Sequence, residues 1–224
     1  MEVVVNKKGF EKFIKAIDKA VSGMGGEIEI AENEMKSLVV DTGHIFLVKS
    51  RLACMTKEKK NLVFGIDTSK LLKLMKVIKG ETITLKIDGK LWINENVGIG
   101  LIDVQSSPKE PKIEFDVKAE VDLQELHNIV KTGMLISDCC KFVAKDNKLI
   151  VEIEGDVDII KFDVGTAQGE GKALYSLEIL DCMLKGHEGI GKLEFATDKP
   201  LKLSIDEGDF KVEYLLAPRI ESEE

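Results

Sequence analysis

Residues 214–224 read Tyr-Leu-Leu-Ala-Pro-Arg-Ile-Glu-Ser-Glu-Glu, an apolar strand that passes through a proline into an acidic end. A domain usually finishes in a frayed polar segment. Here Ala217, Pro218 and Ile220 bring apolar side chains to the surface just before the acidic residues. We interpret this ending as a docking segment. The alternative is an ordinary last strand with a solubilising tail, and the rest of the chain must decide between them.

The composition is that of a soluble globular protein. The chain has 224 residues and a hydrophobic content of 44%, which suits one large domain or two small ones with a proper core. No apolar run approaches the roughly 20 residues that span a bilayer, and residues 1–6 lack the features of a signal peptide. The expected location is cytoplasmic. The net charge of −8 argues against coating nucleic acid with the whole surface but leaves room for a local basic face.

No catalytic site is expected. His44, His127 and His187 are far apart in the sequence, and no zinc-protease motif, Walker motif or nucleophile elbow occurs. Gly98-Ile-Gly100 and residues 186–191 are interpreted as turns or bulges, because no glycine-rich helix start follows them. Four cysteines show no CxxC spacing and are expected to be reduced and buried: Cys54, Cys139, Cys140 and Cys182. The sequence therefore predicts a protein that is not an enzyme and has no cofactor or metal.

The first half alternates strands with two helices. After a strand over 3–5, apolar residues recur at helical spacing: Phe10, Phe13, Ile14, Ile17 and Val21. A second helix is predicted over 67–79, with Asp67 or Thr68 as its N-cap and Gly80 as its stop. Further strands are predicted over 28–31, 38–41, 45–50, 62–66, 83–87, 91–93 and 97–104.

The same plan recurs after a polar linker. Residues 105–112 hold two of the four prolines and predict a surface connector. Beyond it, a strand is predicted over 113–117, and helices on Leu123–Val130 and Leu177–Leu184 are each followed by strands. An internal duplication fixes the architecture. The expected fold is α+β, with two duplicated domains that each place two helices on an antiparallel sheet: an N-terminal domain 1–104, a connector 105–112, a C-terminal domain 113–216 and a docking tail 217–224.

Several segments resemble the PCNA family of DNA sliding clamps. The tail is similar to the family's C-terminus, Leu38–Val48 resembles its aspartate-to-histidine turn, and Tyr175–Leu180 resembles the start of a second-domain helix. Asp146–Asp156 resembles its hairpin and following turn. The resemblance covers nearly the whole chain and implies the DNA-clamp fold. It also implies a processivity factor, most simply a homotrimeric ring, that encircles duplex DNA, is loaded by a clamp loader, and tethers polymerase and repair proteins.

Lysines concentrate on the two helices of the first half. In an acidic protein this separation of charge is typical of a phosphate-binding surface, although lysines that merely solvate an exposed helix face are the alternative. The lysines at 12, 15 and 19 share a face opposite the apolar stripe. The residues expected to face DNA are Lys8, Lys12, Lys15, Lys19, Lys73, Lys76 and Lys79. The second-half helices carry more acidic than basic residues, so a basic lining is expected from the first domain.

The resemblance also implies a pocket for a short partner peptide with aromatic and aliphatic anchors. Its expected residues are Val40, His44, Ile45, Leu47, Pro200, Ala217, Pro218 and Ile220. A histidine that only fills a turn is the alternative for His44. The connector 105–111 offers almost no aliphatic side chains, and we expect this to alter peptide affinity or selectivity.

Ring closure in the family pairs edge strands of neighbouring subunits, here expected over 97–104 and 159–164. The implied interface residues are Gly100, Leu101, Ile102, Ile159, Ile160 and Phe162. The chain is shorter than usual for the family. A monomeric or hetero-oligomeric clamp-like regulator, which binds replication proteins or another clamp without forming its own ring, is therefore the second hypothesis.

Overall fold

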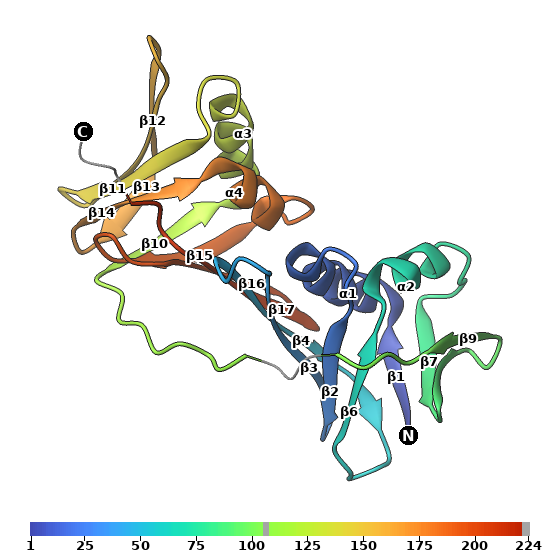
Figure 1. The fold of residues 1–224 in the computed structure, drawn as a ribbon. Helices are drawn as coiled ribbons and strands as arrows, with labels where there is room; N and C mark the ends of the chain where they lie inside the picture. Colours follow the sequence, from blue (N-terminus) through green and yellow to red (C-terminus); the bar gives the residue numbers. More distant parts are fainter. Residues whose placement is uncertain (105–107, 221–224) are drawn as a thin grey trace. The chain divides into compact units, whose positions relative to one another are not determined.

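A computed structural model describes residues 1–104 and 108–220 (Figure 1). The chain divides into two compact units, and each is described by itself. The first contains Met1–Glu110 and Asp206–Glu213, and the second contains Pro111–Ile205 and Tyr214–Glu224. The division after Glu110 falls inside the expected connector. The segment 206–213 groups with the first unit, whereas the sequence interpretation kept it in the C-terminal domain.

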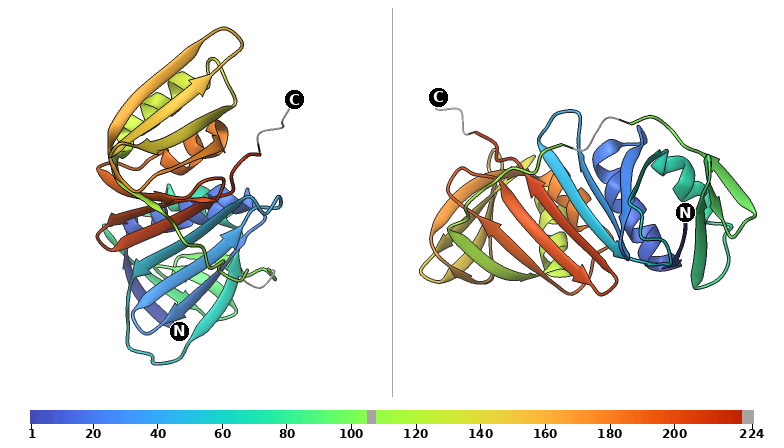
Figure 2. Two further views of the ribbon diagram at one scale, coloured as in Figure 1. Left: turned by 90° about the vertical axis from the view of Figure 1, so that its left-hand side faces the viewer. Right: turned by 90° about the horizontal axis from the view of Figure 1, so that it is seen from below.

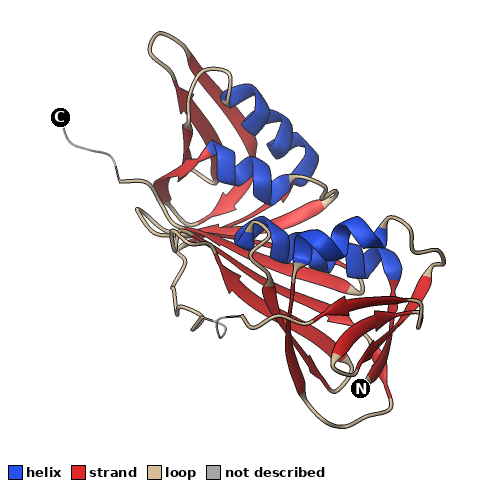
Figure 3. Ribbon diagram, turned by 45° about the vertical axis from the view of Figure 1, so that its right-hand side comes forward, coloured by secondary structure: helices blue, strands red, loops and turns tan. Residues whose placement is uncertain are grey.

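Two helices and nine strands make up residues 1–104 of the first unit. They are β1 (Glu2–Asn6), α1 (Lys7–Val21), β2 (Gly26–Ala31), β3 (Glu34–Val40), β4 (Phe46–Ala53), β5 (Met55–Thr56), β6 (Leu62–Ile66), α2 (Thr68–Met75), β7 (Thr82–Ile87), β8 (Lys90–Ile93) and β9 (Val97–Gly100). One sheet has the strand order β5-β1-β7-β8-β9, and β4, β3, β2 and β6 lie side by side in another. The helices α1 and α2 contact each other and share one face of the unit (Figure 3).

Helix α1 forms where the period of apolar residues predicts it. The Asn6 side chain caps its start by accepting a hydrogen bond from the Gly9 N–H at 2.9 Å. The stripe formed by Phe10, Phe13, Ile14 and Ile17 is fully buried. Ser22, in the left-handed conformation, ends the helix, with its N–H bonded to the Asp18 carbonyl. Burial of this apolar face stabilises the helix far more than its intrinsic propensity does.

Helix α2 is shorter than the predicted span 67–79. Asp67 caps it as expected, by accepting from the Lys70 N–H at 2.8 Å, but the helix ends at Met75. Beyond that point the N–H groups of Val77 and Ile78 bond to carbonyls three residues back. These tighter turns bring Ile78 into the core, where only 8% of its surface is exposed. Lys76 and Lys79 therefore lie past the helix and not on it.

The strand predicted over 97–104 also ends early, at Gly100. After Gly100 the chain leaves the sheet, and the Ile102 N–H donates to the Gly65 carbonyl of β6 at 3.0 Å. A side chain on Gly65 would clash with the Ile102 carbonyl oxygen, which would lie 2.4 Å from an added Cβ. The chain is thus attached to β6 before the connector begins, and β9 is left as a short edge strand.

The second unit repeats this plan with β10 (Val117–Asp122), α3 (Leu123–Gly133), β11 (Cys139–Lys145), β12 (Lys148–Glu154), β13 (Ile159–Gln168), β14 (Gly171–Ser176), α4 (Leu177–Leu184), β15 (Ile190–Phe195) and β16 (Leu201–Glu207). Its strand order is β14-β11-β12-β13-β10-β15-β16. The last strand is β17 (Phe210–Leu216). The turn between β12 and β13 projects from the rest of the unit (Figure 1). The four helices packed on antiparallel sheets confirm the predicted α+β class.

The strand predicted over 113–117 was wrong, because the chain pairs only from Val117 onward, in β10. The register then matches Val117 with Phe195 and Asp122 with Ile190 of β15. Asp122 goes on to cap α3 by accepting from the N–H groups of Gln124 and Glu125, both at 2.9 Å. Figure 2 shows α3 and α4 on the sheet of this unit from two further directions.

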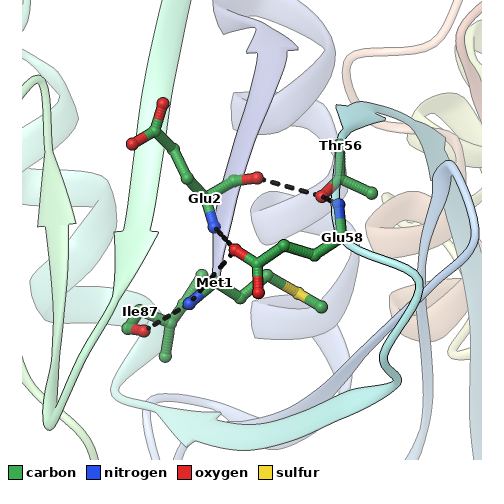
Figure 4. Close-up of polar contacts among 5 residues, drawn as sticks. All are labelled: Met1, Glu2, Thr56, Glu58 and Ile87. Carbon is green, nitrogen blue, oxygen red and sulfur yellow. Dashed lines mark hydrogen bonds and ion pairs between the residues drawn. The ribbon is translucent and has the colours of Figure 1, made fainter.

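Strand β5 was missed by the sequence analysis, and it is held by contacts that are remote in sequence. The Thr56 hydroxyl donates to the Glu2 carbonyl, and Glu58 accepts from the Glu2 N–H at 2.9 Å (Figure 4). The Met1 ammonium donates to the Ile87 carbonyl and lies 3.7 Å from Glu58. These bonds tie the loop after β4 to the start of β1.

Candidate nucleic-acid and partner-binding surfaces

Four lysines follow one stripe of α1. Lys8, Lys12, Lys15 and Lys19 recur every three or four residues, so they share the face opposite the buried apolar residues. Lys8 and Lys15 are exposed, whereas Lys12 and Lys19 are half-buried. Lys73 is exposed on α2, and Lys76 and Lys79 are exposed just after it. All the lysines that were expected to face DNA therefore reach the surface of the first unit, but their side chains are exposed to different extents.

Lys12 on this stripe forms an ion pair. Its ammonium lies 2.6 Å from the Glu207 carboxylate, and the Glu207 side chain is only 13% exposed. A carboxylate this close neutralises much of the charge that Lys12 presents to an approaching polyanion. Lys12 thus holds segment 206–213 against α1. Lys8 and Lys15 are the stronger candidates for phosphate contacts.

The helices of the second unit carry a different charge pattern. His127 Nε2 and Asp181 Oδ1 lie 2.8 Å apart and link α3 to α4. Glu125 is exposed on α3 and Glu178 on α4, and Lys131 is exposed near the end of α3. The basic helix face is therefore a feature of the first unit, as the sequence predicted.

A groove of about 630 Å³ lies in the first unit. Val40 and His44 line it together with Val104 and with Pro108 of the connector. Ile45, which is 46% exposed, and half-buried Leu47 are not among its lining residues. Two of the four residues expected from this part of the chain thus meet in one groove. Pro108 is a connector residue, whereas Val104 directly precedes the connector.

Asp41 shapes the turn at the rim of this groove. Its carboxylate accepts hydrogen bonds from the N–H groups of Ile45 at 2.9 Å and Phe46 at 2.8 Å, and from Gly43 at 3.2 Å. His44 adopts a φ of 55°, and its N–H donates to the Asp41 carbonyl. Asp41 is the aspartate of the aspartate-to-histidine turn that the resemblance implied over Leu38–Val48, and the structure shows which backbone groups its carboxylate binds.

The second unit holds the remaining members of the expected pocket. Pro200, Ala217 and Pro218 are half-buried, and Ile220 is 92% exposed. Arg219 fastens this segment, because its N–H donates to the Leu174 carbonyl at 2.7 Å and its guanidinium pairs with Asp138. The hydrogen bond from Arg219 lowers the pKa of the Asp138 carboxyl. Residues 221–224 of the predicted tail lie outside the described residues.

The expected interface residues lie on or beside two strand edges. Gly100 ends β9, the last strand of its sheet, while half-buried Leu101 and Ile102 follow the strand and lie outside it. Ile159, Ile160 and Phe162 lie on β13, which pairs with β12 along 159–166 and with β10 only at 167–168. Within the described residues, the second edge of β13 over 159–165 thus has no strand partner. Ile159 is 64% exposed there.

Nothing in the described part of the chain points to chemistry at these surfaces. Among residues 1–104 and 108–220, no group of histidine, cysteine and acidic side chains could hold a metal ion. Burial raises the pKa values of the Cys54, Cys139 and Cys140 thiols, which makes them poor nucleophiles. His187 is buried, and its Nε2 lies 2.8 Å from the Tyr214 hydroxyl. None of the helices described here is long and apolar enough to cross a membrane.

Comparison with known proteins identifies the family. No family model matches the chain. A DNA polymerase sliding clamp from Methanothrix thermoacetophila is 30% identical over 229 residues, which cover 92% of this chain and 94% of that protein. The chain belongs to the DNA polymerase sliding clamp family. A second sliding clamp, from Archaeoglobus fulgidus, is 25% identical over 95% of this chain and 97% of its own length.

Solved structures show that nearly the whole of this chain has the sliding clamp fold. The structure of the C-terminal region of FEN-1 bound to A. fulgidus PCNA matches with a TM-score of 0.87 and 24% identity, over 99% of both chains. PCNA from Thermococcus kodakaraensis matches with a TM-score of 0.84 and 21% identity, over 97% of this chain and 99% of that one. Both likenesses concern the fold. They confirm the predicted PCNA-like architecture.

Proposed function

We propose that this sliding clamp assembles into a homotrimeric ring that encloses duplex DNA and tethers a polymerase and other replication and repair proteins to it. Its mechanism is retention on DNA, without catalysis, cofactor or metal. A clamp loader is the expected agent that opens the ring. The protein acts where DNA is, inside the cell.

The observation that carries this proposal is the lysine stripe of α1, on which Lys8 and Lys15 are exposed, in a chain whose net charge is −8. Attraction between lysines and phosphates does not depend on base sequence, so a basic face allows sliding. A uniformly basic protein would instead bind DNA over its whole surface. The positive charge is concentrated on α1 and around α2. This distribution supports a ring whose inner lining is basic and whose exterior is acidic.

The groove at Val40 and His44 supports a docking role. It combines apolar walls with a turn held rigidly by Asp41, which is the kind of surface that accepts a short segment with apolar anchors. The segment Ala217–Ile220 adds a second apolar surface fastened by Arg219. The named relative bound to a FEN-1 segment is a precedent for such docking.

Solution mass tests the assembly. The open edges of β9 and β13 are suited to pair head to tail between copies, because each presents unpaired backbone groups. We expect light scattering on a sizing column to give about three times 24.8 kDa, with little change on dilution. A stable monomer at all protein and salt concentrations would contradict the ring. It would favour the second hypothesis, a clamp-like regulator that acts without a ring of its own.

A further inference from the structure

The outer face of β8 carries the only tryptophan of the sequence, Trp92. Its neighbours Leu91 and Ile93 are fully buried, and side chains alternate between the two faces of a strand. Trp92 therefore lies on the face opposite the core, where it is half-buried. An indole on the solvent side of a sheet adds little to the core and is a candidate contact surface.

Glycines on the neighbouring strand leave this indole uncovered. Gly98 of β9 lies directly across from Trp92. A Cβ added at Gly98 would lie 2.8 to 3.0 Å from three atoms of the six-membered ring, so one side of the indole rests on the Gly98 backbone. Gly100 lies across from Lys90, and an added Cβ there would meet no atom within 4 Å. No side chain of β9 covers the other side of the indole.

Two lysines flank the indole. Lys86 of β7 lies directly across from Trp92, and Lys90 precedes Trp92 by two residues on β8. Lys90 Nζ lies 5.9 Å from the centroid of the Trp92 ring. Both lysines are exposed, and neither forms an ion pair with any residue that the structure describes. Glu2 lies across from Lys86 in β1, so Lys90 is the stronger candidate for contact with an anion.

We infer that Trp92, Lys90 and Lys86 form a contact site for single-stranded nucleic acid. One base would stack on the uncovered side of the indole, and the two ammonium groups would contact the phosphates beside that base. Stacking of this kind accepts any base, and phosphate contacts carry no sequence information. The site uses none of the lysines of α1. A duplex cannot use it, because the bases of a duplex are already stacked on one another.

The charge beside the indole favours a nucleic acid over a peptide. A proline-rich segment also packs on aromatic side chains, but it brings no negative charge to the lysines. A single strand brings both an aromatic base and phosphates. This inference goes beyond the enclosure of duplex DNA and does not depend on it.

The single tryptophan makes intrinsic fluorescence a direct probe of the site. The full-length protein is titrated at low salt with an oligothymidylate of about 12 nucleotides, with an abasic oligomer of equal length, and with a duplex. We expect saturable quenching by the oligothymidylate only. Its log K should fall with log salt with a slope of about −1.4, since each phosphate contact on a single strand contributes about −0.7.

Lys90→Glu should weaken the affinity measured by quenching at least about threefold, because it places a negative charge beside the bound phosphate. Lys118→Glu is the matched control. Lys118 is likewise exposed on a strand, β10, and the residues across from it are Gln168 and Glu194. It changes the net charge equally and should leave the affinity unchanged.

Three results would overturn the inference. The first is no quenching by the oligothymidylate, or equal quenching by the abasic oligomer. The second is an equal loss of affinity in both lysine variants. The third is quenching by a proline-rich peptide and not by the oligothymidylate, which would assign the site to a protein partner. The solution mass stays a separate test, so each of these results leaves the proposed ring standing.

Discussion

Replacing Lys8, Lys15 and Lys19 with glutamate is expected to weaken binding to duplex DNA at least about tenfold at low salt. These residues lie on one stripe of α1, and each lost phosphate contact should reduce the slope of log K against log salt by about 0.9. Lys12 is left unchanged because it pairs with Glu207, so its replacement would also disturb segment 206–213. Salt-titrated anisotropy with a short duplex gives both the affinity and the slope.

The matched control also replaces three lysines with glutamate. They are exposed in the loop after β5: Lys57, Lys59 and Lys60. It changes the net charge by the same amount on a segment without a helix face. We expect this variant to keep the salt slope of the wild type. If both variants lose the same affinity, DNA responds to overall charge, and the assignment of α1 as the DNA-facing surface is wrong.

Ile159→Glu is expected to raise the dissociation constant of the assembly at least about thirtyfold. Ile159 lies on the open edge of β13, is 64% exposed, and would be buried when a second copy pairs with that edge. A carboxylate buried there without a partner carries a large desolvation cost, of the size found at interface hot spots. Light scattering over a dilution series gives the mass at each protein concentration, and the dissociation constant of the assembly follows from these masses.

Val63→Glu serves as the control for this variant. Val63 is also an aliphatic residue on an edge strand, β6, and is 53% exposed. Because both native side chains are exposed in one copy, neither change should lower the unfolding midpoint by much. An unchanged mass for Ile159→Glu, or an equal loss for Val63→Glu, would show that β13 is not the assembling edge.

The elements that the sequence predicted well are those fixed by local patterns. Helix α1 forms on its strong apolar period, and Asp67 caps α2 as predicted. The end of α2 was not predictable in this way, because Ile78 continues the helical period although it is buried from a turn. Strand β5 depends on the hydrogen bond between Glu2 and Glu58. These residues are 56 positions apart in the sequence, so no local pattern reveals the strand.

The candidate site was predictable to a similar extent. The resemblance led to Val40 and His44, which the structure brings into one groove. It did not lead to the pairing of Lys12 with Glu207, a contact across 195 positions of sequence. Tertiary contacts of this kind decide which lysines remain available to DNA. The sequence alone treats the lysines of the stripe as equivalent.

Retention on circular against linear DNA tests the central proposal, enclosure of the duplex, most directly. The clamp is loaded onto a nicked circular plasmid, the complex is isolated by gel filtration at high salt, and the plasmid is then cut once. We expect the protein to stay with the circle and to be released after cutting, because a ring slides off a free end. Equal retention on the cut plasmid, or no retention on the circle once loading has been verified with a known clamp, would contradict enclosure of DNA by this chain.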